Sequence, residues 1–190
     1  TMNIAIVGAT GNVGRKLIEV LEKKKFPISE LFLVASSKSE GKKISYSGKE
    51  YTVIDLEKFD FSNVKIAFFA AGSLIAEKWA HIAAEKTIVI DNSKFFRKDP
   101  EIPLVVPEVN SKELAQVKNK NIIANANCSV IPLVVALKPL HDLYNVKRIV
   151  VSTYQSVSGA GKDAMDELAS QTQEFFQNKK LESKYFTKQI

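Results

Sequence analysis

The 190-residue chain has little cysteine, since Cys128 is the only one. One thiol can neither form an intrachain disulfide nor build a zinc site, so a disulfide or zinc scaffold is excluded and no metal site is expected. Long apolar runs are also lacking: no stretch approaches the roughly 20 residues that span a bilayer. The N-terminus shows no basic region or cleavage site of an export signal. We therefore expect a globular cytoplasmic protein with no membrane segment.

Charge of one sign is not concentrated anywhere along the chain. The formal net charge is +6 and the pI is near 9.2, but the lysines are scattered among acidic residues. A basic stripe interleaved with aromatic residues, as nucleic-acid-binding proteins use, is absent from the sequence. The mild positive charge suits a small anionic ligand, and nucleic acid is not an expected partner.

The stretch NANCSVIPLV, residues 125–134, surrounds the lone cysteine. A free cysteine is more often a buried apolar side chain than a nucleophile. Here, however, Cys128 follows the strand-like run 121–124 and precedes apolar residues at helical spacing, with Pro132 acceptable in a first helical turn. Helix N-termini favour anions, so a thiolate, the form that attacks carbonyls, is stabilised there. Catalysis and packing both stay open on these residues alone.

The first half alternates apolar runs with amphipathic segments. Strands separated by helices and apolar throughout are typical of a parallel sheet covered on both faces. The sequence thus predicts an α/β, doubly wound, Rossmann-like domain. The expected strands are 3–8, 31–36, 64–71 and 87–93, the expected helices 11–25 and 74–86, and 43–54 reads as a hairpin around Ser47-Gly48.

Two further patterns define the expected packing and domain organisation. The first helix is predicted to place Val13, Leu17, Val20 and Leu21 on one face. In the second half, residues 146–157 alternate as a strand packed on one face does, and a helix is expected at 162–177. We expect a first domain at 1–127 and the start of an α+β second domain at 128–190.

The glycine-rich stretch GATGNVG, residues 8–14, lies where the first strand meets the first helix. Gly8 permits a tight turn, Gly11 lets the backbone approach a pyrophosphate, and Gly14 allows close packing of helix on strand. The spacing G-x-x-G-x-x-G is a weak signal, and a glycine-rich turn without a ligand is the alternative. The order strand, loop and helix favours dinucleotide binding.

The segment after the second strand predicts which dinucleotide binds. An NAD site usually ends that strand with Asp or Glu, which binds the ribose 2′-hydroxyl. This chain instead has Ser36, Ser37, Lys38 and Ser39, whose donors and positive charge suit a 2′-phosphate. The cofactor is therefore expected to be NADP; an ordinary polar surface loop is the alternative.

Six stretches, in this order, resemble aspartate-β-semialdehyde dehydrogenase, and the resemblance covers essentially the whole chain. They are GATGNVG, FFAAGS, VIDNSKFFR, PLVVPEVN, NANCS and STYQSVSGAGK. The resemblance implies NADPH-dependent conversion of 4-phospho-L-aspartate to L-aspartate 4-semialdehyde through a cysteine thioester, in lysine, threonine and methionine biosynthesis. It also implies a homodimer, built largely by a catalytic and dimerisation domain that begins within 128–190.

The resemblance also implies roles for individual residues. Cys128 falls on the nucleophile and Gln155 on the residue that orients the substrate, while Arg97 and Asn127 fall on substrate- and phosphate-binding positions. The implied cofactor-binding positions are Thr10, Gly11, Asn12, Val13, Lys38, Ser39, Gly72, Ser73, Ser158 and Gly159. The chain departs from the family at Ala126, where Pro is typical, and at Lys94, in a stretch usually richer in Ser and Thr. From chemistry alone, Arg97 is as readily a surface ion pair, and Gln155 an ordinary sheet-face residue.

This reaction also requires a general acid and a general base, most often histidine, and the chain has only two histidines. His141 lies about 20 Å along the helix from Cys128, and His81 is more often a partly exposed helix residue than a catalytic one. Family members carry their catalytic His downstream of the point that matches Ile190, so the chain resembles the N-terminal part of a longer enzyme and should be inactive alone. The alternatives are N-acetyl-γ-glutamyl-phosphate reductase, which typically has Gly-Cys-Tyr where this chain has Asn127-Cys128-Ser129, or a non-catalytic NADP-binding relative.

Overall fold

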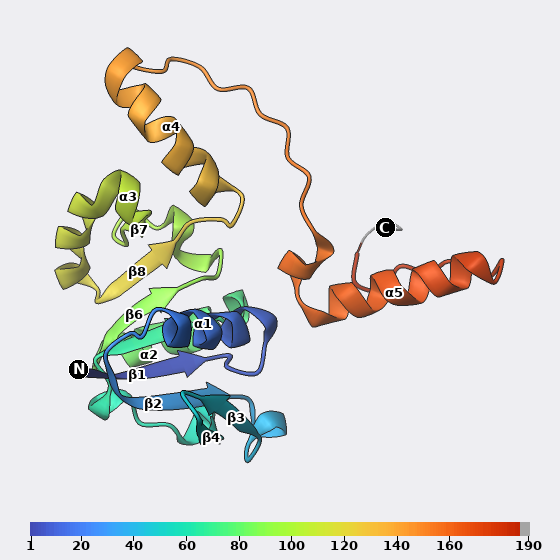
Figure 1. Ribbon diagram of the computed structural model, residues 1–190, viewed down its shortest axis with the longest axis horizontal. Helices are drawn as coiled ribbons and strands as arrows, with labels where there is room; N and C mark the ends of the chain where they lie inside the picture. Colours follow the sequence, from blue (N-terminus) through green and yellow to red (C-terminus); the bar gives the residue numbers. More distant parts are fainter. Residues whose placement is uncertain (187–190) are drawn as a thin grey trace. The chain divides into compact units, whose positions relative to one another are not determined.

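A computed structural model describes residues 1–186, with all side chains except that of Asn119 (Figure 1). The chain forms two compact units, the first Thr1–Ile149 and the second starting at Val150.

The first unit is built on an eight-stranded sheet in the order β3-β4-β2-β1-β5-β6-β8-β7. The strands are β1 (Met2–Val7), β2 (Ile28–Ala35), β3 (Lys43–Tyr46), β4 (Lys49–Asp55), β5 (Ile66–Phe69), β6 (Ile88–Asp91), β7 (Leu104–Val105) and β8 (Ile122–Asn125). All neighbouring pairs are parallel except β3 with β4, which form the predicted antiparallel hairpin. The α/β, doubly wound prediction is thus confirmed.

The helical segments connect these strands. The α-helices of the first unit are α1 (Asn12–Lys23), α2 (Ser73–Ala84), α3 (Pro107–Asn110) and α4 (Val130–Tyr144). The 3₁₀ segments are η1 (Ser37–Ser39), η2 (Leu56–Lys58), η3 (Phe61–Asn63), η4 (Phe95–Lys98) and η5 (Ser111–Asn119). In the second unit, η6 (Val157–Ala160) precedes α5 (Lys162–Phe176), which matches the helix expected at 162–177.

Both faces of the central sheet are buried, as its apolar strands predict. On one face, Ile4 and Ile6 of β1 pack in a core with Ile18 and Leu21 of α1. On the other face, Ala5 and Val7 of the same strand share a core with the alanines of α2, Ala76, Ala80, Ala83 and Ala84. Figure 1 shows α1 and α2 on opposite sides of β1. Alternate side chains of one strand therefore serve two cores.

The buried face of α1 differs from the predicted one. Leu17 is half-buried and Leu21 is buried as expected, but Val13 and Val20 are 54% and 40% exposed. The buried side is instead Gly14, Ile18 and Leu21. Gly14 presses against the preceding turn and fixes which side faces the sheet. A neighbouring residue is rotated by about 100°, which carries Val13 away from the sheet.

The register of the sheet aligns the carboxyl ends of the parallel strands. The pairing places five residues in one row across it: Val34, Val7, Phe69, Asp91 and Ala124. The strand order reverses at β1, since the chain runs from β1 to β2 on one side and returns to β5 on the other. Doubly wound proteins bind ligands beyond the carboxyl ends at this reversal. The segments one to four residues after this row are therefore the candidate site.

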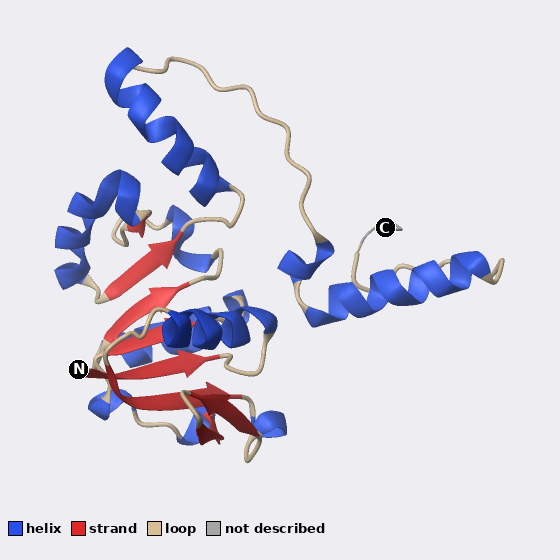
Figure 2. Ribbon diagram, in the orientation of Figure 1, coloured by secondary structure: helices blue, strands red, loops and turns tan. Residues whose placement is uncertain are grey.

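The strand expected at 146–157 is not present. Residues 145–156 form neither helix nor strand and are drawn as a loop in Figure 2, and η6 begins at Val157. Within residues 1–186, no strand pairs with this segment. Val150 is 81% exposed and Tyr154 is fully exposed. Alternation marks a segment suited to a sheet, but a strand also requires a neighbour for its N–H and C=O groups.

Candidate dinucleotide site and the Cys128 loop

The turn after β1 requires glycine at two positions. Gly8 has φ +88°, and a Cβ there would lie 2.7 Å from the carbonyl carbon and oxygen of Ala70, which follows β5. A Cβ on Gly14 would lie 2.2 Å from the Gly8 carbonyl oxygen, so α1 could not approach the turn this closely with any side chain there. The roles predicted for Gly8 and Gly14 agree with this geometry.

The helix after this turn begins without a side-chain cap. Gly11 is the N-cap of α1, its backbone is extended, and it supplies no capping hydrogen bond. The first N–H groups of any α-helix lack partners within that helix, and the helix dipole makes this end positive. The turn and the start of α1, which includes Asn12 and Val13, can therefore accept a phosphate.

The structure brings the glycine turn together with the segment after β2. The hydroxyl oxygens of Thr10 and Ser39 lie 3.4 Å apart. Lys42 Nζ donates to Ser39 Oγ at 3.5 Å, and Arg15 Nε donates to the Thr10 carbonyl oxygen at 3.2 Å. Ser36, the N-cap of η1, and Lys38 are exposed beside them. Arg15 and Lys42 add positive charge that sequence reasoning missed, because only the fold brings these residues near Thr10 and Ser39.

The segment after β5 borders the same turn. The Ala70 N–H donates to the Val7 carbonyl at 2.8 Å, which ties the ends of β5 and β1. Gly72 follows with φ +86°, caps α2, and is exposed, while Ser73 is half-buried at the first position of that helix. Both predicted positions thus lie at the reversal of the strand order.

Cys128 lies in the loop between β8 and α4 and is exposed, so the packing interpretation does not describe it. Ser129 is the N-cap of α4, and Cys128 directly precedes it. The side chain of half-buried Asn127 accepts the Ser129 N–H at 3.0 Å, and its carbonyl accepts the N–H groups of Val130 and Ile131 at 2.9 and 3.0 Å. The expected position at a helix start is confirmed. Three strand spacings, about 14 Å, separate the ends of β1 and β8 along this edge.

Arg97, on η4, lies beside the same loop. Its Nε donates to the carbonyl oxygen of Asn125 at 3.0 Å, and its Nη2 donates to the carbonyl oxygen of Asn92 at 3.1 Å. The guanidinium is half-buried and forms no ion pair with the described residues within 4 Å. The surface ion pair considered as its alternative role is thus absent from the described residues.

The carboxylate of Asp91, which directly precedes Asn92, is buried. Asp91 is fully buried at the end of β6 and accepts the N–H of Ser93 at 3.1 Å and its O–H at 2.6 Å. Burial raises the pKa of the Asp91 carboxyl, while the hydrogen bonds from Ser93 and the charge of Arg97 oppose that rise. Asp91 was not predicted as a site residue, although its position near the end of a predicted parallel strand was the available signal.

The two histidines take the positions expected of ordinary helix residues. His81 is exposed on α2, and its ring packs edge-on against Phe96 with 5.3 Å between centroids. His141 is exposed in the last turn of α4. Neither is among the residues that hold the Cys128 loop.

Three predicted site residues belong to the second unit. Gln155 is exposed in the extended segment before η6. Ser158 and Gly159 lie on η6, where the Ser156 side chain caps the segment by accepting the Ser158 N–H at 3.3 Å. The Gly159 N–H donates to the Ser156 carbonyl oxygen at 3.1 Å. Their roles stay predictions from the family resemblance.

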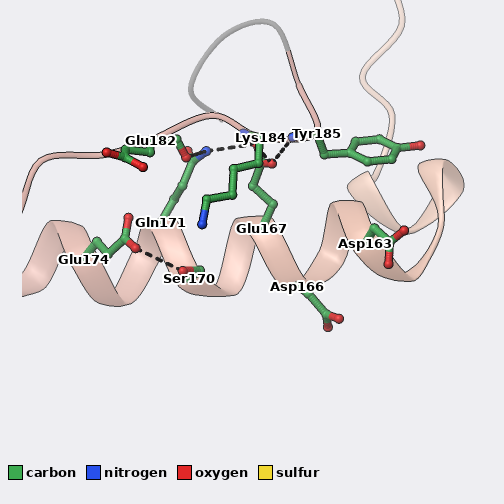
Figure 3. A pocket seen from close by; sticks show the side chains of 9 residues that line it. All are labelled: Asp163, Asp166, Glu167, Ser170, Gln171, Glu174, Glu182, Lys184 and Tyr185. Carbon is green, nitrogen blue, oxygen red and sulfur yellow. Dashed lines mark hydrogen bonds between the residues drawn. The ribbon is translucent and has the colours of Figure 1, made fainter.

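The second unit also has a hollow along α5 (Figure 3). Its lining is mainly acidic: Asp163, Asp166, Glu167, Ser170, Gln171, Glu174, Glu182, Lys184 and Tyr185. Glu167 holds the chain after α5 by accepting the N–H groups of Lys184 at 3.0 Å, of Tyr185, and of Phe186 at 3.4 Å. Burial alone would raise the pKa of the Glu167 carboxyl, but these backbone hydrogen bonds outweigh it and hold the pKa below its usual value. The carboxylate thus has a structural function.

Neither a metal cluster nor a membrane-spanning helix occurs in the part of the chain that the structure describes. Within residues 1–186, no cluster of three or more His, Cys, Asp or Glu side chains is arranged to hold a metal ion. No helix in the same range is long and apolar enough to cross a membrane.

The doubly wound sheet, the glycine turn at its strand reversal and the uncapped start of α1 define a dinucleotide-binding protein of the Rossmann-like class. The chain belongs to the semialdehyde dehydrogenase family. Residues 3–117 match the family model described as "Semialdehyde dehydrogenase, NAD binding domain", and residues 137–190 match that of the "Semialdehyde dehydrogenase, dimerisation domain". The predicted boundary between residues 127 and 128 falls between these two matches and stays a prediction.

Relatives extend the match along the whole chain. Aspartate-semialdehyde dehydrogenase 2 of Vibrio cholerae is 53% identical over 189 residues, and that of Shewanella violacea is 50% identical; each match covers 99% of this chain and 56% of the relative. The crystal structure of the Vibrio cholerae enzyme II complexed with ASA has a TM-score of 0.94 and 52% identity, and covers all of this chain and 57% of that one. The crystal structure of the Candida albicans enzyme with NADP has a TM-score of 0.63 and 28% identity, and the match covers 77% of this chain and 48% of that one. The chain thus spans somewhat more than half the length of the relatives from the two bacteria.

Proposed function

We propose that the chain carries the NADP-binding and nucleophile-bearing part of an aspartate-semialdehyde dehydrogenase. The reaction is the reductive dephosphorylation of 4-phospho-L-aspartate to L-aspartate 4-semialdehyde, with phosphate released, in the biosynthesis of lysine, threonine and methionine. The observation that carries the proposal is an exposed sole cysteine, three residues after the backbone carbonyl that binds Arg97, on the sheet edge that holds the glycine turn. The identity of about half of all residues to enzymes of that name supports it.

The cofactor fits the turn after β1. A Cβ on Gly8 or Gly14 would collide with backbone, so the close approach of turn and helix that a pyrophosphate needs exists only with glycine there. Gly11, Thr10, Asn12 and Val13 would hold the pyrophosphate at the start of α1. Ser36, Lys38 and Ser39 would bind the 2′-phosphate, and Gly72, Ser73, Ser158 and Gly159 complete the proposed contacts.

Cys128 performs the covalent step. Its sulfur attacks the acyl carbon of 4-phospho-L-aspartate, the C–O bond to phosphate breaks, and a thioester on Cys128 results. When bound, NADPH would supply the hydride that reduces this thioester. The thiohemiacetal then collapses, the C–S bond breaks, and the aldehyde leaves as the thiolate reforms. The helix N-terminus beside Cys128 favours that anion.

Arg97, Asn127 and Gln155 bind and orient the substrate in this proposal. Arg97 lies beside the Cys128 loop with donors directed by two backbone carbonyls, so it can hold the anionic phosphate oxygens. Asn127 directly precedes the nucleophile, and Gln155 would orient the substrate through its amide. We further propose that the longer protein is a cytoplasmic homodimer, in line with the dimerisation-domain match at 137–190.

The relatives favour this reaction over that of N-acetyl-γ-glutamyl-phosphate reductase. The most similar relatives reported above are aspartate-semialdehyde dehydrogenases, and this chain has Asn-Cys-Ser at the nucleophile. The exposure of Cys128 speaks against a non-catalytic relative in which the thiol only packs.

The test replaces Cys128 by serine and follows acyl transfer by intact-mass spectrometry after incubation with 4-phospho-L-aspartate. Because Cys128 is the sole thiol, any thioester must form there. We expect an adduct on the parent chain, none on Cys128→Ser, and NADPH binding within about twofold in both, since the sulfur lies outside the pyrophosphate turn. An equal adduct in the serine variant would contradict the nucleophile role, and lost NADPH binding would point to a folding defect.

A further inference from the structure

Arg97 joins the segment after β6 to the end of β8 at the sheet edge. It extends from η4, which follows β6, and donates Nε–H to the carbonyl oxygen of Asn125, the last residue of β8 before the Cys128 loop. Nη2 donates to Asn92, directly after β6. The position of the guanidinium and the path of the chain toward Cys128 are therefore coupled.

An amide bridge reinforces this coupling. Asn125 Nδ2 donates to Asn92 Oδ1 at 2.7 Å, and Asn92 Nδ2 donates to the Phe69 carbonyl oxygen at 3.3 Å. Asn92 directly follows β6 and Asn125 is the last residue of β8, each one position after the aligned pair Asp91 and Ala124, so the bridge crosses neighbouring strands. It keeps the carbonyls of Asn92 and Asn125 at the separation that one guanidinium can span.

The two hydrogen bonds also decide which donors of Arg97 face a ligand. The side of the guanidinium formed by Nε and Nη2 is occupied by the two carbonyls. Nη1 makes no hydrogen bond within residues 1–186. The N–H groups of Nη1 and the second N–H of Nη2, which form the outer end of the guanidinium, are therefore available to an anion. A planar end-on fork of this kind matches two phosphate oxygens.

Upstream, a single carboxylate sets the turn from which Arg97 extends. Both oxygens of Asp91 are bonded to Ser93, one by the backbone N–H and one by the hydroxyl. Ser93 Oγ in turn accepts the Phe95 N–H at 3.1 Å, at the first residue of η4. Phe96, 1% exposed, anchors η4 in the core. The carboxylate thus determines the path of the chain from β6 to Arg97.

We propose that Asp91 is a positioning residue for Arg97: through Ser93 it holds η4 so that the guanidinium joins Asn92 to Asn125 and presents its end to the phosphate of the substrate beside Cys128. The inference rests on the proposed function, because it assumes that Arg97 meets that phosphate. Asp91 acts only through Ser93 and the field it exerts on Arg97, so it takes no part in bond making.

The test measures how inorganic phosphate protects Cys128 from alkylation by iodoacetamide. In the parent chain we expect protection that saturates with phosphate concentration, which yields a dissociation constant. In Asp91→Asn, which keeps the size of the side chain but removes its charge, we expect that constant to rise between about 10- and 100-fold, because misaligned donors lose charge-assisted hydrogen bonds to the anion. The Ser93→Ala variant, which removes only the hydroxyl, should give a smaller rise in the same direction.

The turn after β4 provides a matched control, because it also begins with a buried aspartate. Asp55 is 5% exposed at the end of β4, and its Oδ1 accepts the N–H two residues later, at 3.3 Å, as Asp91 does. Asp55→Asn therefore makes the same chemical change in a turn that does not lead to Arg97. Its phosphate constant should equal that of the parent, and thermal unfolding of all variants shows whether a loss of stability could explain an effect.

A second readout reports on Arg97 directly. The chain has three arginines, Arg15, Arg97 and Arg148, so the Nε–H signals are few, and Arg97→Lys identifies its own. We expect the Arg97 Nε–H to exchange slowly with water in the parent and in Asp55→Asn, and on the order of tenfold faster in Asp91→Asn, because its hydrogen bond to Asn125 opens more often.

The outcomes separate the two proposals. If phosphate protects the parent and both Asp91→Asn and Ser93→Ala equally, with unchanged Nε–H exchange, the positioning role is wrong and the phosphate site stands. If phosphate does not protect the parent at any concentration, the phosphate site next to Cys128 is wrong and the positioning role falls with it. Should Asp91→Asn fail to fold, Ser93→Ala decides, since parent-like protection in that variant overturns the inference.

Discussion

At the scale of single residues, the site depends on a few contacts between loops that are distant in sequence. Thr10 meets Ser39 across 29 positions, and Arg97 meets Asn125 across 28. Both contacts join segments that follow neighbouring or near-neighbouring strands at one sheet edge. A substitution here acts on binding and orientation rather than on the core, which lies on the two faces of the sheet.

Lys38 should decide the choice of dinucleotide. It is exposed beside Ser39, whose hydroxyl lies close to Thr10 of the glycine turn. An ammonium next to a 2′-phosphate contributes a charge-assisted contact, so NADPH should bind at least about tenfold more tightly than NADH, and Lys38→Ala should lose most of that preference.

Calorimetric titration of both dinucleotides into the two proteins measures this preference. Lys49→Ala, which removes an exposed lysine from the hairpin of β3 and β4, is the control and should bind like the parent. Tighter binding of NADH than of NADPH by the parent would refute the assignment of NADP.

Two glycines of the turn should respond differently to alanine. A Cβ at Gly14 would lie 2.2 Å from backbone and must push α1 away from the turn, whereas one at Gly11 would lie 3.4 Å away, an ordinary contact. We expect Gly14→Ala to lose about 1–3 kcal/mol of unfolding free energy, and Gly11→Ala to remain folded but bind NADPH more weakly.

Chemical denaturation measures the stability of the Gly14→Ala and Gly11→Ala variants, and titration with NADPH measures their affinity for the dinucleotide. The interpretation of the turn would be wrong if Gly14→Ala were as stable as Gly11→Ala, or if Gly11→Ala bound the dinucleotide as the parent does.

At the scale of elements, helices and paired strands behave differently along this chain. α5 forms as its spacing predicts because the hydrogen bonds of a helix are internal. The segment 145–156 has the alternation of a strand but no partner within residues 1–186, and its apolar side chains from Ile149 to Tyr154 are exposed. Beyond α5, the chain is held by the Glu167 carboxylate, which accepts three backbone N–H groups, together with hydrogen bonds from Gln171 to the Glu182 carbonyl and from the Tyr185 hydroxyl to the Ala160 carbonyl.

This attachment should depend on pH. The pKa of Glu167 is lower in the folded chain than in the unfolded one, so the carboxylate contributes stability above its unfolded pKa of about 4.3. That contribution is lost as the pH falls through the lower folded value. As the pH falls below about 4, the backbone amides of residues 184 and 185 should therefore lose protection from hydrogen exchange, after correction for intrinsic exchange rates.

Replacing Glu167 by glutamine removes the charge at neutral pH and should speed exchange of the same amides on the order of tenfold. Glu182→Gln, an exposed carboxylate in the same segment, is the matched control and should leave exchange unchanged. Equal protection in parent and Glu167→Gln from neutral to acidic pH would show that the carboxylate does not hold this segment.

At the scale of the whole molecule, the first unit contains the glycine turn, Cys128 and both histidines of the chain. His81 packs against Phe96, and His141 lies about 20 Å from Cys128 by helix rise. The thioester chemistry needs a group that gives and takes protons. We expect the 190-residue chain to bind NADPH and to acylate at Cys128 without completing turnover.

Phosphate-dependent oxidation of L-aspartate 4-semialdehyde with NADP, followed by the absorbance of NADPH, tests this expectation. A full-length aspartate-semialdehyde dehydrogenase serves as the positive control in the same assay. Robust activity of the 190-residue chain would show that a histidine or another group within it suffices, and His81→Ala would then identify the group.

The sequence by itself determined the central strands and helices of the first unit, the glycine turn, the helix start at Cys128 and the family, because these depend on local periodicity and on short motifs. Only the tertiary structure decided that α1 buries Gly14 and Ile18 rather than Val13 and Val20, since close packing on the turn sets the rotation of the helix. It alone joined Asp91, Asn92, Arg97 and Asn125, which lie near one another because parallel strands in register bring their carboxyl ends to a single edge. The same dependence on a partner explains why alternation at 146–157 did not suffice to make a strand.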